Sequence, residues 1–195
     1  TSADTVAHLE ARFPQLGGRE VWELMQNKVP KVLASTLEPA PWPANPEQEW
    51  CPPGHGDIYA CLAGSGWLER LLASGVRYAF VSNSDNLGAT LDPAILAWFA
   101  DSGMPFAMEV TRRTESDKKG GHLAVRLRDG RFLLRESAQC PKDDEKHFQD
   151  IDQHRYFNTN NLWIDLVALK AALAANDGLI PLPPIMNKKT VDPRD

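Results

Sequence analysis

The sequence predicts an α/β fold, a mixed sheet flanked by helices and contained in one domain. Apolar runs of strand length alternate along the chain with stretches of helical periodicity, which is typical of α/β folds. The chain has 195 residues, of which 43% are hydrophobic and 24% are charged. A chain of this length and composition can bury a sizeable core.

The N-terminal part is expected to hold little sheet. Residues 2–13 have the apolar spacing of an amphipathic helix, and residues 19–26 alternate weakly, as a strand does. Residues 29–53 are rich in proline, which blocks both helix and central strand, so this stretch is predicted to be a long extended connector. Its two tryptophans, Trp42 and Trp50, indicate that the connector packs on the domain.

Regular structure is expected from residue 56 onward. Residues 56–75 have helical spacing, with Asp57 as an N-terminal cap and Gly75 as a C-terminal stop. The elements expected after this helix are a strand at 78–83, a helix at 91–103, a strand at 105–111, a hairpin at 122–137, a short acidic helix at 141–151, and a strand running into a helix at 161–178.

Composition excludes several function classes. The net charge is −5, with a pI of about 5.5, which gives no support for a nucleic-acid footprint. No apolar run is long enough to cross a bilayer, and the start of the chain has no signal-peptide pattern. Cys51, Cys61 and Cys140 are odd in number and widely spaced, which favours reduced thiols in a cytoplasmic protein.

A burst of polar residues follows the apolar run at 78–81. Ligands of open α/β sheets bind beyond the carboxyl ends of the strands, so polar groups at a strand's end are candidate ligand groups. Asp85 is the one acid among them and could hold Mg²⁺, which takes oxygen ligands from one or two carboxylates and from substrate phosphates. The alternative is that Asp85 only starts a turn. The burst consists of Ser82, Asn83, Ser84, Asp85 and Asn86.

Two glycine-containing loops could approach a phosphate or a sugar. Residues 52–57, PPGHGD, place glycines around His55 ahead of a predicted helix start, where backbone N–H groups favour phosphate. Residues 118–122, KKGGH, join a basic pair to a glycine pair just before a strand. A tight turn and a solvated lysine loop, respectively, are the structural alternatives.

Amides and one further acid could bind hydroxyl groups. Residues 157–163, FNTNNLW, contain three asparagines, whose side chains both donate and accept hydrogen bonds and so suit sugar hydroxyls. They could instead satisfy the backbone of a turn. Glu136 follows an apolar strand and could accept hydrogen bonds from vicinal hydroxyls, or lie at the rim of the sheet.

The sequence contains no recognisable nucleophilic site. No Ser-His-acid arrangement can be read, and four histidines have no ligand spacing and are expected at the surface: His8, His122, His147 and His154. The candidate groups therefore suit a site that positions two phosphorylated substrates better than one that forms a covalent intermediate.

Five blocks of sequence, taken in order and with their spacing, resemble the eukaryotic-type UTP–glucose-1-phosphate uridylyltransferase (UDP-glucose pyrophosphorylase) family. They are EWCPPGHGDIYACLAGSGWLERLL, YAFVSNSDNLGATLDP, MEVTRRTESDKKGGHL, RESAQCP and RYFNTNNLWIDL. The resemblance covers nearly the whole chain, and the five blocks together are highly specific. The wording of WCPPGHGD and NKKTVDPRD is most similar to an actinobacterial branch.

The resemblance implies a Rossmann-like nucleotidyltransferase fold of the sugar-nucleotide type and Mg²⁺-dependent synthesis of UDP-glucose and pyrophosphate from UTP and glucose 1-phosphate. Its implied catalytic residues are Asp85, which would hold Mg²⁺, and His55, which would reach the phosphates. Asn83 and Gly54 would lie against the nucleotide, and Gln26 would contact uracil. The glucose pocket would be lined by Gly120, Gly121, Glu136, Asn158 and Asn160.

The chain departs from the family pattern in what it lacks. Members carry a glycine-rich loop and lysine that grip UTP, and a C-terminal β-helical domain; the Gly17–Gly18 pair does not match that loop. Residues 1–195 are therefore expected to be an incomplete central part of the catalytic domain, inactive alone. Without its covering segments, such a fragment is expected to self-associate through an open strand edge.

Two alternatives remain open from the sequence. A UDP-sugar or UDP-N-acetylglucosamine pyrophosphorylase would share the fold and differ in the sugar. A non-catalytic sugar-nucleotide-binding module would share the pocket and lack the chemistry. A glycine-rich loop encoded upstream of Thr1 would favour an enzyme over a binding module.

Overall fold

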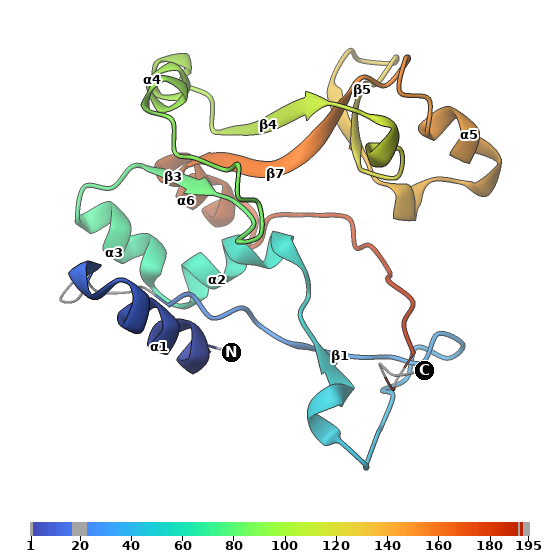
Figure 1. The fold of residues 1–195 in the computed structure, drawn as a ribbon, viewed down its shortest axis with the longest axis horizontal. Coiled ribbons are helices and arrows are strands. Elements are labelled where there is room, and N and C mark those ends of the chain that lie inside the picture. The colour runs from blue at the N-terminus through green and yellow to red at the C-terminus, as the bar shows by residue number, and fades with distance from the viewer. Residues whose placement is uncertain (1, 17–22, 191, 193–195) are drawn as a thin grey trace.

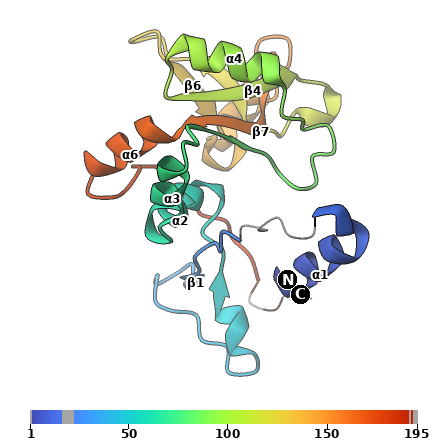
Figure 2. The same cartoon turned by 90° about the vertical axis from the view of Figure 1, so that its left-hand side faces the viewer.

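A five-stranded sheet organises the chain, with helices on both of its faces (Figures 1 and 2). The computed structural model describes residues 2–16, 23–190 and 192. Strand β7 (Tyr156–Asp165) is central, because β3 (Tyr78–Val81), β4 (Phe106–Arg112) and β5 (His122–Val125) all pair with it. Strand β6 (Phe132–Arg135) pairs with β5. The predicted α/β class with flanking helices is confirmed, and each of these strand pairs is antiparallel.

One face of the sheet is covered by three helices. These are α2 (Ile58–Gly64), α3 (Trp67–Ala73) and α6 (Leu166–Ala174). Their apolar side chains meet β7 in a core cluster that consists of Leu62, Leu68, Ile164, Leu166, Leu169 and Leu173. Burial of these leucines and of Ile164 is a main stabilising term for this half of the domain.

Helix α4 (Pro93–Ser102) covers the opposite face (Figure 2). Its Phe99 is fully buried, with its ring centroid 5.6 Å from that of Tyr78 on β3 and 6.5 Å from that of Trp163 on β7. The residues predicted to begin and end this helix do so. Asp92 accepts a hydrogen bond from the Ala94 N–H, and Gly103 ends the helix with a positive φ.

The N-terminal elements differ in part from expectation. Helix α1 (Ser2–Arg12) is present as predicted, followed by the 3₁₀ turn at Pro14–Leu16. The predicted strand at 19–26 is wrong for residues 23–26, which have no regular structure, and its earlier residues lie outside the described ones.

The proline-rich stretch is an extended connector, as predicted. It carries a small antiparallel sheet of β1 (Val29–Pro30) and β2 (Trp50–Cys51), with a 3₁₀ turn at Pro46–Glu49. Trp50 is 42% exposed, and Lys28 Nζ lies 5.1 Å from the centroid of its ring. The expectation that the connector packs on the domain therefore draws no support from Trp50, which has a lysine over its ring.

The stretch at 56–75 forms two helices rather than one. Gly66 has a φ of +79°, which breaks the helix between α2 and α3, and Gly75 ends α3 with a φ of +84°. Asp57 makes no side-chain cap, contrary to prediction, because its carboxylate binds Asn27 instead. The 3₁₀ turn before α2 spans His55–Asp57.

Most later elements match their predicted positions, but the short strand expected from residue 161 is the ten-residue strand β7, which begins at Tyr156. Strands β5 and β6 form the predicted hairpin, which turns at Gly130 with a φ of +69°. The acidic helix is a 3₁₀ turn at Lys142–Asp144 followed by α5 (Glu145–Phe148). Further 3₁₀ turns occur at Glu115–Asp117 and Ser137–Gln139.

Membrane-spanning helices and cysteine pairing were both considered in the sequence, and the structure bears on each. In the part of the chain that the structure describes, no helix is both long enough and apolar enough to cross a membrane. Cys51, Cys61 and Cys140 are free thiols.

Candidate active site

The loop after β3 presents the predicted acid to solvent. Backbone bonds from Asn86 N to Asn83 O (3.1 Å) and from Ala89 N to Asn86 O (3.0 Å) fold the loop into successive turns. Asp85 lies in the first turn and is exposed, whereas Asn83 and Asn86 are partly buried. The alternative that Asp85 starts a turn therefore fits the backbone. Its carboxylate is exposed, so it could still bind a cation.

The asparagine-rich part of β7 is locally irregular. Asn160 has a φ of +61°, a left-handed conformation that asparagine tolerates better than most residues. The pairing of β4 with β7 shifts register between Met108 and Val110, as at a β-bulge. The Asn158 carboxamide oxygen accepts the Asn160 N–H (2.7 Å), so one asparagine does satisfy local backbone, as the structural alternative held.

Two side-chain hydrogen bonds join β7 to the loop that carries Asp85. Asn160 Nδ2 donates to Asn83 Oδ1 (2.7 Å), and Asn86 Nδ2 donates to Asn161 Oδ1 (3.2 Å). The predicted glucose-side and nucleotide-side amides are therefore in direct contact, although about 75 residues of chain separate them.

The glycine pair lies against the second predicted acid. A Cβ atom placed on Gly121 would be 2.5 Å from Glu136 Oε1, so any other residue here would force the Glu136 carboxylate to move from its present position. Gly121 O accepts the Asn158 N–H (3.0 Å), which connects the pair to the asparagine segment. Burial raises the pKa of Glu136. The predicted glucose-pocket residues thus form one contiguous group with Asn83.

A buried arginine holds the loop that leads to the glycine pair. Arg113 is 4% exposed, and its guanidinium donates to four backbone carbonyls at 2.6–3.3 Å. Two of these belong to Asp117 and Lys118, just before the glycines. The other two belong to Phe148 and His154. The sequence analysis missed this residue, since an arginine pair at a strand end has no distinctive pattern.

Two of the histidines are not at the surface, contrary to prediction. His122 is fully buried and its ring stacks on that of His154 at 4.0 Å between centroids, beside Phe148. Burial, together with the nearby positive charges of His154 and the arginines, lowers the pKa of His122 to about 4. Both rings therefore support the hairpin as neutral groups at pH 7.

The residues predicted for uracil and phosphate form a second group. Gln26 Nε2 donates to Gly54 O (2.8 Å), and Gly54 has a φ of +104°. His55 follows and is exposed. Asp57 accepts bonds from the backbone and the side chain of Asn27 at 2.8 and 3.0 Å, which ties the two loops together.

The charge state of Asp57 follows from these contacts. Although burial acts to raise it, the hydrogen bonds from Asn27 and from the Cys61 thiol hold the pKa of Asp57 below its ordinary value. The carboxylate is therefore ionised at pH 7, and it clamps the Gln26 segment to the Gly54–His55 loop.

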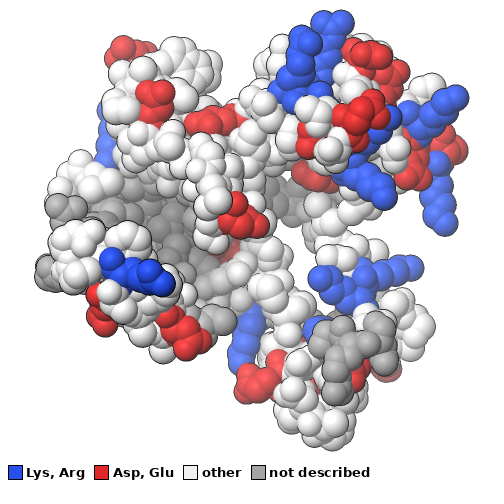
Figure 3. All heavy atoms as spheres, in the orientation of Figure 1, with Lys and Arg blue, Asp and Glu red and all other residues white. Residues whose placement is uncertain are grey.

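A wide gap, rather than a closed pocket, separates the sheet from the connector. Figure 3 shows it between the part that carries β5, β6 and α5 and the part that carries β1 and β2. No described contact joins the Gln26–Gly54 group to the Asn83–Glu136 group. That Asp85, Glu136, Asn158 and His55 line one cleft therefore stays a prediction.

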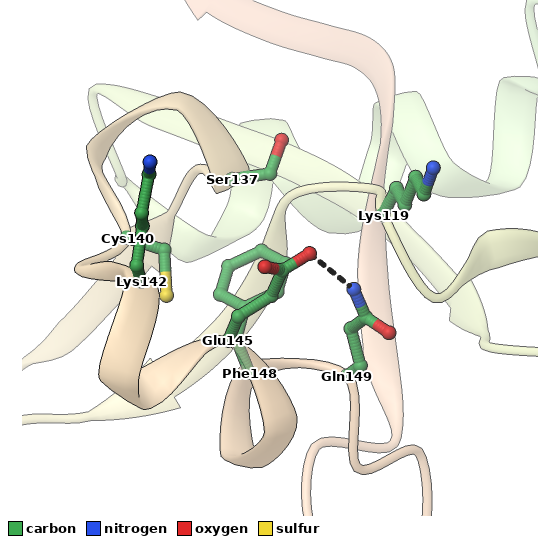
Figure 4. Close-up of a pocket in the computed structure, with 7 residues that line it drawn as sticks. All are labelled: Lys119, Ser137, Cys140, Lys142, Glu145, Phe148 and Gln149. Carbon is green, nitrogen blue, oxygen red and sulfur yellow. Dashed lines mark hydrogen bonds between the residues drawn. The ribbon is translucent and has the colours of Figure 1, made fainter.

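Neither of the two described cavities is lined by a predicted site residue, although Lys119 and Ser137 in the larger one are chain neighbours of Gly120 and Glu136. The larger, of about 280 Å³, opens beside α5, where Gln149 Nε2 donates to Glu145 Oε1 (2.9 Å; Figure 4). The smaller, of about 220 Å³, lies between α3 and α6. The larger is lined by Lys119, Ser137, Cys140, Lys142, Glu145, Phe148 and Gln149. Of these side chains, the sequence analysis named Lys119, in the basic pair before the glycines, and Cys140, as a free thiol, and it predicted no pocket here.

The whole chain, residues 1–195, matches the family model of UTP–glucose-1-phosphate uridylyltransferase. A probable UTP–glucose-1-phosphate uridylyltransferase of Schizosaccharomyces pombe is 41% identical over 167 residues, which are 85% of this chain and 32% of that protein. The Saccharomyces cerevisiae enzyme is also 41% identical, over 85% of this chain and 33% of its own length.

Solved structures of UDP-glucose pyrophosphorylases are similar to this chain over its full length. A UDP-glucose pyrophosphorylase mutant from Leishmania major has a TM-score of 0.88 at 55% identity and covers 100% of this chain and 43% of its own. Another mutant of that enzyme, in complex with UDP-glucose, gives the same values. A UDP-glucose phosphorylase from Trypanosoma brucei has a TM-score of 0.90 at 51% identity, with the same coverage.

The similarity to these solved structures shows that the chain has a nucleotidyltransferase fold. It belongs to the UTP–glucose-1-phosphate uridylyltransferase family. The chain spans about a third of the length of the curated relatives it matches. The relatives named above are eukaryotic, so the predicted actinobacterial branch is not supported.

Proposed function

We propose that the longer protein to which this chain belongs transfers a uridylyl group from UTP to glucose 1-phosphate, giving UDP-glucose and pyrophosphate. Membership of the family supports the activity, and the complex of the Leishmania major relative with UDP-glucose supports the ligand. The observation in this chain that carries the proposal is the Asn160–Asn83 bond of 2.7 Å. This bond joins an amide that we propose for the sugar to the loop that we propose for the nucleotide.

The proposed reaction needs positioning more than covalent chemistry. An oxygen of the glucose phosphate attacks the α-phosphorus of UTP, and the bond from that phosphorus to the bridging oxygen breaks to release pyrophosphate. No nucleophile on the protein takes part, in keeping with the hydrogen-bonding character of the groups described above. Catalysis then consists of alignment and of neutralising the charge that develops on the phosphates.

Asp85 is the proposed holder of Mg²⁺. Among the described residues, no group of three or more His, Cys, Asp or Glu side chains could hold a metal ion. One exposed carboxylate nevertheless fits Mg²⁺, which often binds one or two carboxylates and takes its other ligands from phosphates and water. When bound, the ion would neutralise phosphate charge. His55, exposed after Gly54, is the proposed contact to the phosphates.

The nucleobase is proposed to bind between Gln26 and Gly54. Because one Gln26 amide proton is engaged by Gly54 O at 2.8 Å, Gln26 Oε1 is left to accept a hydrogen bond. Uracil offers an N3–H donor there, whereas cytosine offers an acceptor. The Asp57–Asn27 clamp supports this preference, because it holds the segment that carries Gln26 in place.

The glucose moiety is proposed to bind where the glycine pair, Glu136 and the β7 amides meet. A carboxylate accepts from vicinal hydroxyls, and amides both donate and accept. The residues proposed to line this pocket are Gly120, Gly121, Glu136, Asn158 and Asn160.

We further propose that residues 1–195 are the central part of the catalytic domain, act in the cytoplasm and do not turn over alone. The glycine-rich loop that the family uses for UTP has no counterpart in this sequence. In the described residues, β6 pairs only with β5, and Phe132 on it is 75% exposed. Such an apolar edge favours self-association of the isolated chain.

A pyrophosphate-release assay on the longer protein, with UTP, glucose 1-phosphate and Mg²⁺, tests the activity. We expect turnover with glucose 1-phosphate to exceed that with galactose 1-phosphate and with N-acetylglucosamine 1-phosphate. Preference for another sugar phosphate would favour a related UDP-sugar pyrophosphorylase. Tight UDP-glucose binding without turnover would favour a binding module. Turnover by residues 1–195 alone would overturn the proposal that the chain is incomplete.

A further inference from the structure

We propose that Glu109 is a positioning residue for the Asp85 loop, and that it acts by fixing the orientation of the Asn161 carboxamide. The link to catalysis rests on the proposed function, in which the Asp85 loop carries the metal ligand. Glu109 lies on β4 at the register shift opposite the asparagine segment of β7. An acid in the middle of the otherwise apolar PFAMEV stretch was the signal in the sequence, and it was missed.

The Glu109 carboxylate is held by two partners on β7. Oε1 accepts a hydrogen bond from the indole N–H of Trp163 (2.7 Å), and Oε2 accepts one from Asn161 Nδ2 (2.9 Å). Trp163 is 1% exposed, so its N–H has no access to bulk water and needs this acceptor. The backbone oxygen of Glu109 also accepts from the Thr159 hydroxyl (2.8 Å).

An ionised carboxylate can only accept hydrogen bonds, and this property sets the direction of the chain of contacts. The Asn161 amide must turn its NH₂ toward Glu109, which leaves Asn161 Oδ1 facing the loop. Asn86 must then donate, as it does from Nδ2 at 3.2 Å. Asn161 is 6% exposed, so its amide has little solvent to compensate a wrong orientation.

The consequence falls on the residue next to Asp85. Asn86 follows Asp85 directly and closes its turn by donating its backbone N–H to Asn83 O (3.1 Å). The Asn86–Asn161 bond and the Asn83–Asn160 bond are the two described side-chain contacts between this loop and β7. Loss of the first leaves the loop fastened at Asn83 alone, with Asp85 on the freed side.

A charge swap tests this direction of donation. In Glu109→Gln, the Gln carbonyl oxygen keeps the Trp163 partner, so its NH₂ faces Asn161 and forces that amide to flip. Asn161 Nδ2 then meets Asn86 Nδ2, so the observed bond is lost, and a new one forms only if the half-buried Asn86 amide also turns over and rearranges the loop. In the double variant Glu109→Gln/Asn161→Asp, the new carboxylate at 161 accepts from both neighbours, so the chain of contacts is restored with almost no change of volume.

The readouts are kcat for UDP-glucose synthesis and the Mg²⁺ concentration for half-maximal activity, measured on the longer protein. In Glu109→Gln we expect kcat to fall and the required Mg²⁺ to rise, each about tenfold, as for loss of one charge-assisted hydrogen bond. Asn161→Asp alone places two carboxylates together and should be at least as impaired. The double variant should recover kcat to within about threefold of the unmodified protein.

The matched control is Glu69→Gln, which removes the same charge at an exposed ion pair with Lys170 on the far helices. It should leave both readouts unchanged. A double variant no better than the worse single variant would overturn the inference, as would a Glu109→Gln variant whose Mg²⁺ requirement equals that of the control.

A second readout separates this inference from the proposed function. Thermal unfolding of the unmodified protein, the two single variants and the double variant gives the coupling between positions 109 and 161 without any assay of activity. We expect the double variant to be more stable than either single variant. If the unmodified protein makes no UDP-glucose but this coupling is present, the proposed function fails and the positioning contact stands. If the coupling is absent, the inference is wrong whatever the activity.

Discussion

A single methyl group added at Gly121 tests the glucose pocket. The Cβ of Gly121→Ala would lie 2.5 Å from Glu136 Oε1 and 2.6 Å from both Cδ and Oε2. Contacts under 3.0 Å essentially do not occur for Cβ atoms. The carboxylate must therefore withdraw by about 0.5 Å or more, because repulsion rises steeply at such distances.

The expected magnitude follows from that displacement. Misplacing a group in a binding site by about 1 Å can cost about a hundredfold, so a shift of about 0.5 Å is expected to cost about tenfold, or about 1.4 kcal/mol. We expect the Kd for UDP-glucose, measured by calorimetric titration of the longer protein, to rise by about this factor. The KM for glucose 1-phosphate should rise similarly, and the KM for UTP should not.

Gly64→Ala is the matched control for the same chemical change. Gly64 is the last residue of α2, and a Cβ there would meet no heavy atom within 4 Å. This variant should bind UDP-glucose normally, with stability unchanged or raised by up to about 1 kcal/mol. If Gly121→Ala bound UDP-glucose as tightly as this control, Glu136 would not be a sugar ligand.

Three further outcomes are expected of the longer protein. Asp85→Asn should lower kcat by about 10²–10³-fold with unchanged circular dichroism, because a neutral amide holds Mg²⁺ poorly; near-normal pyrophosphate release would remove Asp85 from the metal role. Arg113→Met should lower the free energy of unfolding, measured with denaturant, by about 3–5 kcal/mol. The exposed neighbour gives the control, because Arg112→Met should change that free energy by less than about 0.5 kcal/mol. Equal effects would refute the proposal that Arg113 anchors the loop. Because burial lowers the pKa of His122 to about 4, the unfolded chain takes up its proton first, so stability should fall as pH drops from about 6.5 toward 4. A His122→Gln variant should show a shallower fall over that window, and an identical slope would contradict the buried neutral ring.

Local signals were predictable where one residue decides the structure. Helix α4 follows its sequence closely, because Asp92 caps it, Pro93 starts it and Gly103 stops it. The hairpin turn at Gly130 is of the same kind. In each case the backbone preference and the side-chain contact lie within a few residues of each other, so the sequence contains the whole cause.

Predictions failed where a distant partner decides the outcome. Asp57 has the position of a helix cap, but Asn27, thirty residues earlier, takes its carboxylate. His122 looked like a surface residue, yet it is buried against His154 and Phe148. Glu109 stands out in the sequence as an acid in an apolar stretch, but its partners depend on a register shift between two strands.

The candidate site contains residues that the sequence predicted and supporting residues that it did not. The sequence singled out Asn83, Asn160, Gly121 and Glu136 separately, and the structure brings them into one contiguous group. Their resemblance to family motifs, rather than their spacing, carried the assignment of roles. Some of the contacts around these residues come from side chains outside the predicted site, such as Arg113, and such supports have no motif.

The most direct test is a structure of the longer protein with UDP-glucose bound. The account predicts glucose hydroxyls within hydrogen-bonding distance of the Glu136 carboxylate and of the Asn158 or Asn160 amides, with uracil against Gln26. A single ligand would then span the two groups of residues that remain unconnected in the chain alone. UDP-glucose bound elsewhere, such as in the cavity beside α5, or with its uracil remote from Gln26, would contradict it.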